Sequence, residues 1–125
     1  WRAQDWIGAG PGAHGRLTEA RARLATLSTR TPGAYLARVA ENGLGWQTAD
    51  ALNALESAEE AVLMGLRLSE GLDLVDLAHR FDWHPDPDRL AALVSDGLIE
   101  AKPDRLVLTG AGRPLADRAG MRLLS

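Results

Sequence analysis

The spacing of apolar residues is most regular in the second half of the chain, where it predicts three helices. A capping box, Ser57 with Glu60, precedes an apolar run that continues to about Ser69. Apolar side chains at i, i+3, i+4 and i+7 predict a second, shorter helix over 73–81, capped by the aspartate at its start. An Asp-Pro pair begins a third helix over 86–97, and a glycine ends it.

After this third helix the period changes and predicts a β-hairpin. Residues 98–101 and 106–109 are short apolar segments. Between them, residues 102–105 carry Pro at the second and Asp at the third position, an order that favours a type I turn. Thr109 can then cap a last helix that reaches Leu123.

Helix, short helix, helix and hairpin follow one another in the order of a winged helix, whose hairpin closes the exposed flank of the helices. The sequence therefore predicts a mainly α fold with a small β-hairpin. Its independently folding part is a winged-helix-like domain over 57–125.

Near the amino terminus, Trp6 and Ile7 predict a short buried strand that runs into a glycine-rich loop. Residues 16–30 fit two structures equally well. Their leucines suit one helical stripe, but the same stretch also suits two short strands joined near residues 19–20.

The next signals in the chain predict a helix and then a connector. A Thr-Pro pair predicts a helix with Thr31 as its N-cap and Pro32 as its first residue, and apolar residues recur at helical spacing up to Gly43. Residues 43–56 lack a clear period and are predicted to form a connector, with a turn of helix near 51–55.

Composition narrows the class of protein. The chain has 125 residues, 46% of them hydrophobic and 25% charged, which is typical of one ordinary folded domain. No apolar run approaches the ~20 residues of a membrane span, so no transmembrane segment is predicted. The chain starts at Trp1 without a Met or a signal peptide, and we expect it to be a piece of a longer protein. Zero cysteines exclude disulfides, a cysteine nucleophile and any iron–sulfur cluster held by these residues.

The charge distribution argues against nucleic-acid binding. The formal net charge is -3, and residues 57–125 hold eight basic and twelve acidic side chains. The helix that would enter the major groove carries three aspartates beside one arginine. A phosphate backbone requires a clustered positive face, so we expect no nucleic-acid partner. An acidic winged-helix regulatory or docking domain remains as an alternative function.

The glycine-rich loop is the main candidate for ligand contact. Gly10, Gly12 and Gly15 match GxGxxG after a candidate strand, but no acidic residue follows about 20 positions later to bind a ribose. A glycine loop can still let a ligand approach the backbone closely. We therefore predict a loop that lines a pocket and donates N–H groups.

The three histidines show no metal-ligand spacing. His14, flanked by small residues in the glycine loop, is the imidazole best placed to face a ligand. His79 and His84 are expected at the surface. No catalytic set and no metal site are predicted.

Several phrases taken together resemble one known family. They are Trp6-Ile-Gly-Ala-Gly-Pro-Gly-Ala-His-Gly15, Arg16-Leu17, Pro32…Tyr35-Leu36…Val39, Glu60…Leu63-Met64-Gly65-Leu66-Arg67-Leu68 with Glu70-Gly71, Gly97-Leu98-Ile99-Glu100, and Leu106…Leu108-Thr109…Gly112-Arg113. In this order they resemble the C-terminal region of the oxygen-independent coproporphyrinogen III oxidase-like radical SAM family. The GPGAH phrase is most similar to its heme-chaperone branch.

The resemblance implies a domain organisation. An upstream barrel would carry a CxxxCxxC motif for a [4Fe–4S] cluster and S-adenosylmethionine. Residues 1–30 would be its detached end, with 16–30 extended, and residues 31–56 would form a connecting helix and linker before the winged-helix-like domain over 57–125. The loop residues Gly8, Gly10, Gly12 and His14 would then lie at the barrel mouth, near the cofactor or the porphyrin.

The resemblance also implies a role in heme or porphyrin metabolism, either as a heme chaperone or as a coproporphyrinogen oxidase. The chain itself would be non-catalytic. Its expected partners are the upstream radical SAM barrel, a heme or porphyrin, and a heme-acceptor protein, in a cytoplasmic setting.

Overall fold

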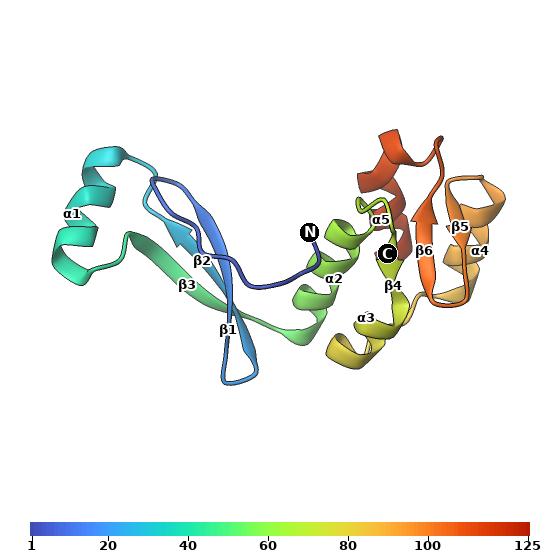
Figure 1. Cartoon of the computed structure of the whole chain (residues 1–125), viewed down its shortest axis with the longest axis horizontal. Coiled ribbons are helices and arrows are strands. Elements are labelled where there is room, and N and C mark those ends of the chain that lie inside the picture. Colours follow the sequence, from blue (N-terminus) through green and yellow to red (C-terminus); the bar gives the residue numbers. More distant parts are fainter. The chain divides into compact units, whose positions relative to one another are not determined.

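A computed structural model describes residues 1–125 and divides the chain into two compact units (Figure 1). The N-terminal unit comprises Gln4–Asn53. The C-terminal unit comprises Ala54–Ser125 together with Trp1–Ala3. Each unit has its own three-stranded antiparallel sheet, so the fold is mixed α/β. The expected mainly α class is thereby corrected to mixed α/β, while the small β-hairpin of the C-terminal unit is present.

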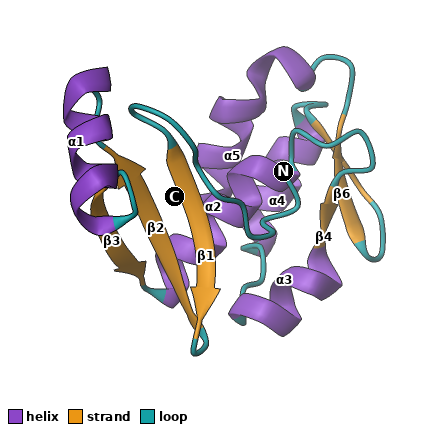
Figure 2. Ribbon diagram, turned by 60° about the vertical axis from the view of Figure 1, so that its left-hand side comes forward, coloured by secondary structure: helices purple, strands orange, loops and turns teal.

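The N-terminal unit is a meander with one helical insertion. Strands β1 (His14–Glu19), β2 (Ala22–Ser28) and β3 (Trp46–Leu52) pair in the order β1-β2-β3, and helix α1 (Pro32–Asn42) lies between β2 and β3 in the chain (Figure 2). The two-residue turn Ala20-Arg21 has φ values of 47° and 70°, the left-handed pair that joins tightly twisted hairpins. The extended alternative for 16–30 is therefore confirmed.

Two predictions in this unit were wrong. Trp6 makes only a single bridge with Arg16, and Ile7 is 74% exposed, because the chain enters the glycine loop before a ladder can extend. The predicted connector contains β3, which has large apolar side chains only at its two ends and exposes most of its length. Its hydrogen bonds to β2 define the strand, and no period-2 pattern signals it.

Helix α1 begins and ends where the sequence predicts. Pro32 is its first residue, and Gly43 adopts the left-handed conformation, with φ 74°, that ends it. The expected apolar face is not packed, however, since no α1 side chain is buried and Leu36 is 67% exposed. The helix boundaries thus follow local signals, while its packing inside this chain is incomplete.

The C-terminal unit contains four α-helices and a small sheet. Its helices are α2 (Ala54–Gly65), α3 (Leu74–Phe81), α4 (Pro87–Ser95) and α5 (Ala116–Leu124), the last preceded by a 3-10 turn over Arg113–Leu115. Strands β4 (Leu72–Asp73), β5 (Ile99–Ala101) and β6 (Arg105–Leu108) pair in the order β4-β6-β5. Helices α3 and α4 and the β5–β6 hairpin confirm the sequence-based predictions, whereas β4 was not predicted.

Two caps in this unit differ from expectation. Helix α2 starts three residues before Ser57, which is buried inside the helix instead of capping it. Thr109 does not cap α5, because its hydroxyl donates to the Gly97 carbonyl (2.6 Å) and accepts from the Gly112 N–H (3.0 Å). In both cases tertiary packing overrides a plausible local motif.

The core of the C-terminal unit is a single cluster that joins all of its helices to the sheet. It is formed by the buried residues Ala3, Ala61, Val62, Leu66, Leu72, Leu77, Leu93, Leu98, Ile99, Leu106, Leu108, Ala119 and Leu123. Ala3 comes from the first residues of the chain, where Arg80 donates to the carbonyls of Arg2 (3.3 Å) and Ala3 (2.7 Å). The start of the chain is therefore part of this unit.

Asp73 combines two contacts whose removal should be measurable. Its Oδ1 accepts from the N–H groups of Val75 (3.0 Å) and Asp76 (2.9 Å) to cap α3, and its Oδ2 lies 3.0 Å from Nη2 of Arg105. We expect Asp73→Ala to lower the free energy of unfolding by about 1–2 kcal/mol in urea denaturation followed by helix circular dichroism.

The matched control for this variant is Asp86→Ala. Asp86 caps α4 through the N–H groups of Asp88 and Arg89, each at 3.0 Å, but it has no ion pair. It should lose about 1 kcal/mol. A smaller loss at Asp73 than at Asp86 would contradict a contribution from Arg105.

Candidate functional site

The glycine-rich loop over residues 8–13 is held by hydrogen bonds within the N-terminal unit. The Gly10 N–H donates to the Tyr35 hydroxyl (3.2 Å), and the Gly12 N–H donates to the Thr29 carbonyl (2.8 Å). The Ala13 N–H donates back to Gly10 (3.3 Å). These three N–H groups are committed to the protein, so in this conformation the loop offers a ligand its small surface and not these donors.

Two of these glycines are required by the backbone. A Cβ on Gly8 would lie against the carbonyl of His14, a contact that only a shift of the backbone could relieve. Gly10 has φ 102°, a conformation that side chains disfavour. The glycines therefore shape the loop so that it fits closely against β1.

His14 is the first residue of β1 and its side chain is exposed. Its carbonyl accepts from the Trp6 indole N–H (3.2 Å). Directly across the ladder stands Leu27 of β2, and opposite residues of an antiparallel pair project to the same face. The imidazole thus stands beside Leu27.

Leu27 also lines a cavity of about 560 Å³ next to the glycine loop, and this cavity is a hollow wide open at the surface of the unit. The cavity is lined by Leu27, Thr29, Arg30, Thr31, Ala34, Arg38 and Gln47. Gly12 lies close to Arg30, one of the residues that line this cavity, since a Cβ placed on Gly12 would be 3.8 Å from Cγ of Arg30. The predicted loop and this cavity therefore belong to one site.

The cavity is positively charged, which the sequence analysis did not foresee. Arg30 makes no hydrogen bond or ion pair, and Arg38 donates only to the Trp46 carbonyl (3.1 Å). None of the residues that line the cavity is acidic. The signal in the sequence was slight: two arginines eight residues apart, on either side of a helix start.

The sheet face that carries His14 and Leu27 also holds two further arginines, but these contact an aromatic ring. Trp6 has the guanidinium carbons of Arg16 and Arg23 at 5.7 and 5.8 Å from its ring centroid, within cation–π distance. Arg23 is buried there. These two arginines stabilise the unit and differ from the two at the cavity.

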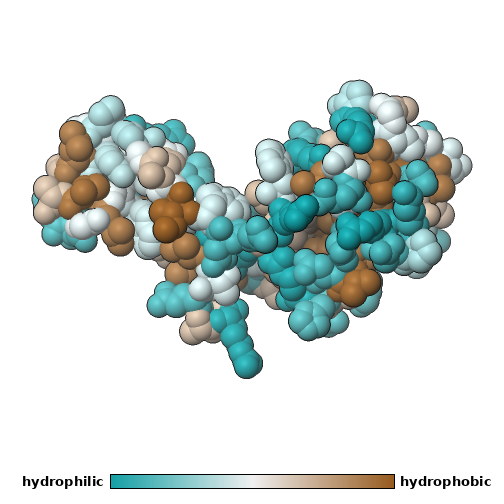
Figure 3. Space-filling view, in the orientation of Figure 1, coloured by the Kyte–Doolittle hydropathy of each residue, from teal (hydrophilic) through white to brown (hydrophobic).

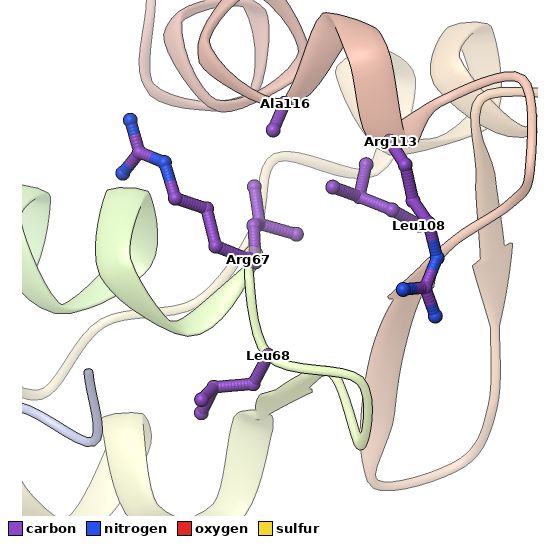
Figure 4. Close-up of a pocket in the computed structure, with 6 residues that line it drawn as sticks. Arg67, Leu68, Leu108, Arg113 and Ala116 are labelled. Carbon is purple, nitrogen blue, oxygen red and sulfur yellow. The ribbon is translucent and has the colours of Figure 1, made fainter.

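A second, smaller cavity of about 220 Å³ lies in the C-terminal unit (Figure 4). Leu66 and Leu108 are among the residues that line it, and the guanidinium groups of Arg67 and Arg113 point away from each other. Arg67 pairs with Asp117 and lies 5.7 Å from the Trp1 ring centroid. Two arginines thus line each cavity, but those of the smaller one point apart and Arg67 already pairs with Asp117.

The remaining candidates from the sequence, two histidines and any metal-ligating or membrane-spanning group, form no further site in the structure. His79 and His84 are exposed, as predicted. No group of three or more His, Asp or Glu is placed to hold a metal ion. None of the helices combines the length and the apolar character that crossing a bilayer requires.

Comparison with known proteins defines the class. Residues 52–115 match the family model described as the HemN C-terminal domain, and the chain belongs to this family. The resemblance seen in the sequence is thereby confirmed.

Particular relatives agree with this family. The heme chaperone HemW of Mycobacterium tuberculosis is 36% identical over 124 residues, which cover 99% of this chain and 30% of that protein. The mitochondrial radical S-adenosyl methionine domain-containing protein 1 of Danio rerio is 37% identical over 58% of this chain and 17% of its own length. The chain therefore spans about 30% or less of the length of these relatives.

A solved structure supports the same fold. Coproporphyrinogen III oxidase (HemN) of Escherichia coli, described as a radical SAM enzyme, matches with a TM-score of 0.70 at 21% identity. The match covers 98% of this chain and 29% of that one. Relatives of this kind imply a [4Fe–4S] cluster, but the chain has no cysteine and its residues do not fit that group.

Proposed function

We propose that this chain is the C-terminal part of a heme chaperone, a longer protein with a radical SAM barrel upstream. The observation that carries the proposal is the 36% identity to heme chaperone HemW across 99% of the chain. In this proposal heme is the cargo, and the chain contributes binding surface without performing catalysis.

We further propose that the N-terminal unit packs against the upstream barrel as its last piece, near the tetrapyrrole. Ile7, Leu36 and Leu44 are exposed in this unit, and Figure 3 shows apolar surface where α1 lies. Exposed apolar patches of this kind mark contact surfaces. The outer edges of β1 and β3 also lack a strand partner, apart from the single bridge at Trp6.

For the C-terminal unit we propose a winged-helix-like docking role. Its helices and hairpin follow one another in the winged-helix order, which supports this assignment. On α4, Asp86 and Asp88 lie at the end that would approach a phosphate backbone. Such a surface favours a protein partner, such as the barrel or a heme acceptor, over nucleic acid.

The test uses the longer protein that contains this chain. Heme titration followed by Soret absorbance should show saturable binding, and the loaded protein should transfer heme to an apo-hemoprotein. Coproporphyrinogen III incubated anaerobically with S-adenosylmethionine should remain unconverted. Conversion without heme binding would instead identify an oxidase.

The competing class, an acidic winged-helix regulatory or docking domain without a radical SAM barrel, can be separated by the coding sequence upstream of Trp1. We expect a CxxxCxxC motif within alternating strands and helices. A start codon close to Trp1 would contradict the proposal.

A further inference from the structure

The arginine-lined cavity of the N-terminal unit carries two guanidinium groups that no carboxylate of the chain neutralises. Arg30 has no polar partner, and Arg38 has only the Trp46 carbonyl. We infer that Arg30 and Arg38 form a pair that binds the propionate carboxylates of a tetrapyrrole. This inference rests on the proposed function, because that function supplies the class of ligand.

The backbone directs the cavity-lining residues to one surface. Thr31, Ala34 and Arg38 are spaced at i, i+3 and i+7, so they share one face of α1, and all three line the cavity. Arg30 lies two residues before the first residue of this helix. The amino-terminal end of α1 adds positive potential at the same place, since Thr31 makes no side-chain cap.

The chemistry of the lining favours carboxylates on an apolar body. A guanidinium presents paired N–H donors that match the two oxygens of a carboxylate. Leu27 and Ala34 supply apolar surface beside the two arginines. A tetrapyrrole combines an apolar ring with propionates, whether it is a heme or a free porphyrin, and would use both kinds of contact.

The glycine loop leaves this approach open. Gly12 lies beside Arg30 without a side chain, and Gly10 has nothing within 4 Å of the position where a Cβ would stand. His14 stands next to Leu27 on the same face of the sheet. A ring held by its propionates at Arg30 and Arg38 would therefore meet Gly10 and Gly12 on this side, with His14 and Leu27 beside them.

The experiment titrates the longer protein that contains this chain with coproporphyrin III, which carries propionates, and follows the arginine Nε–H resonances by NMR. A cationic porphyrin that bears N-methylpyridinium groups in place of carboxylates is the second probe, and inorganic phosphate is the third. We expect coproporphyrin III to shift the signals of Arg30 and Arg38, and the other two probes to shift them much less. The double variant Arg30→Ala/Arg38→Ala should bind coproporphyrin III about tenfold more weakly or worse.

Arg21→Ala is the matched control, because it removes the same charge from an exposed turn of the same unit. It should leave the affinity unchanged. Arg30→Ala alone breaks no hydrogen bond in the structure, so it keeps the test valid if the double variant is unstable. Equal affinity of the arginine variants and the unchanged chain would overturn the inference, as would an equal response to phosphate or the absence of any binding. Heme binding by the longer protein would still support the proposed function in each of these cases.

Discussion

Replacing Leu66 by alanine lowers the free energy of unfolding of the C-terminal unit by about 3 kcal/mol or more, the expected cost of emptying a filled core site. Leu66 lies just after α2 and is only 1% exposed. Its side chain faces α5, since a Cβ placed on Gly120 would be 3.6 Å from its Cδ1. The alanine variant would leave a cavity between the end of α2 and α5. Because the two segments already approach each other closely at Gly120, they cannot move together far enough to fill it.

The matched control is Leu55→Ala, the same substitution on the exposed side of α2. Leu55 is 62% exposed, and its replacement should change stability by no more than roughly 0.5 kcal/mol. Urea denaturation followed by helix circular dichroism measures both variants. Similar losses for the two would show that the core assignment of Leu66 is wrong.

The helices that could be predicted from the sequence are those whose ends are set by their own residues. Asp73 and Asp86 each accept two backbone N–H groups at the start of their helices, a contact made within four residues of chain. Gly43 ends α1 in the same local way. Such signals do not depend on the rest of the fold, which is why these boundaries were predicted correctly.

The elements that were missed depend on distant partners. Strand β3 exists because β2 supplies its hydrogen bonds, and β4 consists of two residues that pair with β6. Ser57 has the sequence of a cap, but burial against the core places it inside a longer helix. Local patterns cannot register these influences, because the stabilising contact is far away in the chain.

The candidate site likewise has some features that the sequence could predict and others that it could not. The glycine loop could be recognised from composition, since closely spaced glycines imply an unusual backbone. The use of its N–H groups could not, because it depends on Thr29 and Tyr35, which only the folded chain brings near. The pairing of Arg30 with Arg38 around one cavity likewise results from the direction in which α1 leaves β2.

Replacing Gly71 by alanine is expected to destabilise the C-terminal unit by roughly 3 kcal/mol, because two separate costs combine there. Gly71 has φ 82°, in the left-handed region. A Cβ would also meet the backbone carbonyl of Leu106 and would lie 2.8 Å from Cγ2 of Val107. Leu106 belongs to β6, the central strand of the sheet, so the obstacle is backbone that cannot move without breaking the ladder.

Gly97 separates these two costs. Its φ of 69° is similarly left-handed, but nothing lies within 4 Å of its Cβ position. Gly97→Ala should therefore lower the free energy of unfolding only by the cost of a left-handed backbone conformation, about 1 kcal/mol. Amide hydrogen exchange of β6 gives a second readout, since only the Gly71 variant should accelerate exchange at Leu106 selectively. If the two alanine variants lose equal stability, the close approach of β6 to Gly71 does not limit the fold, and backbone conformation alone accounts for the glycine.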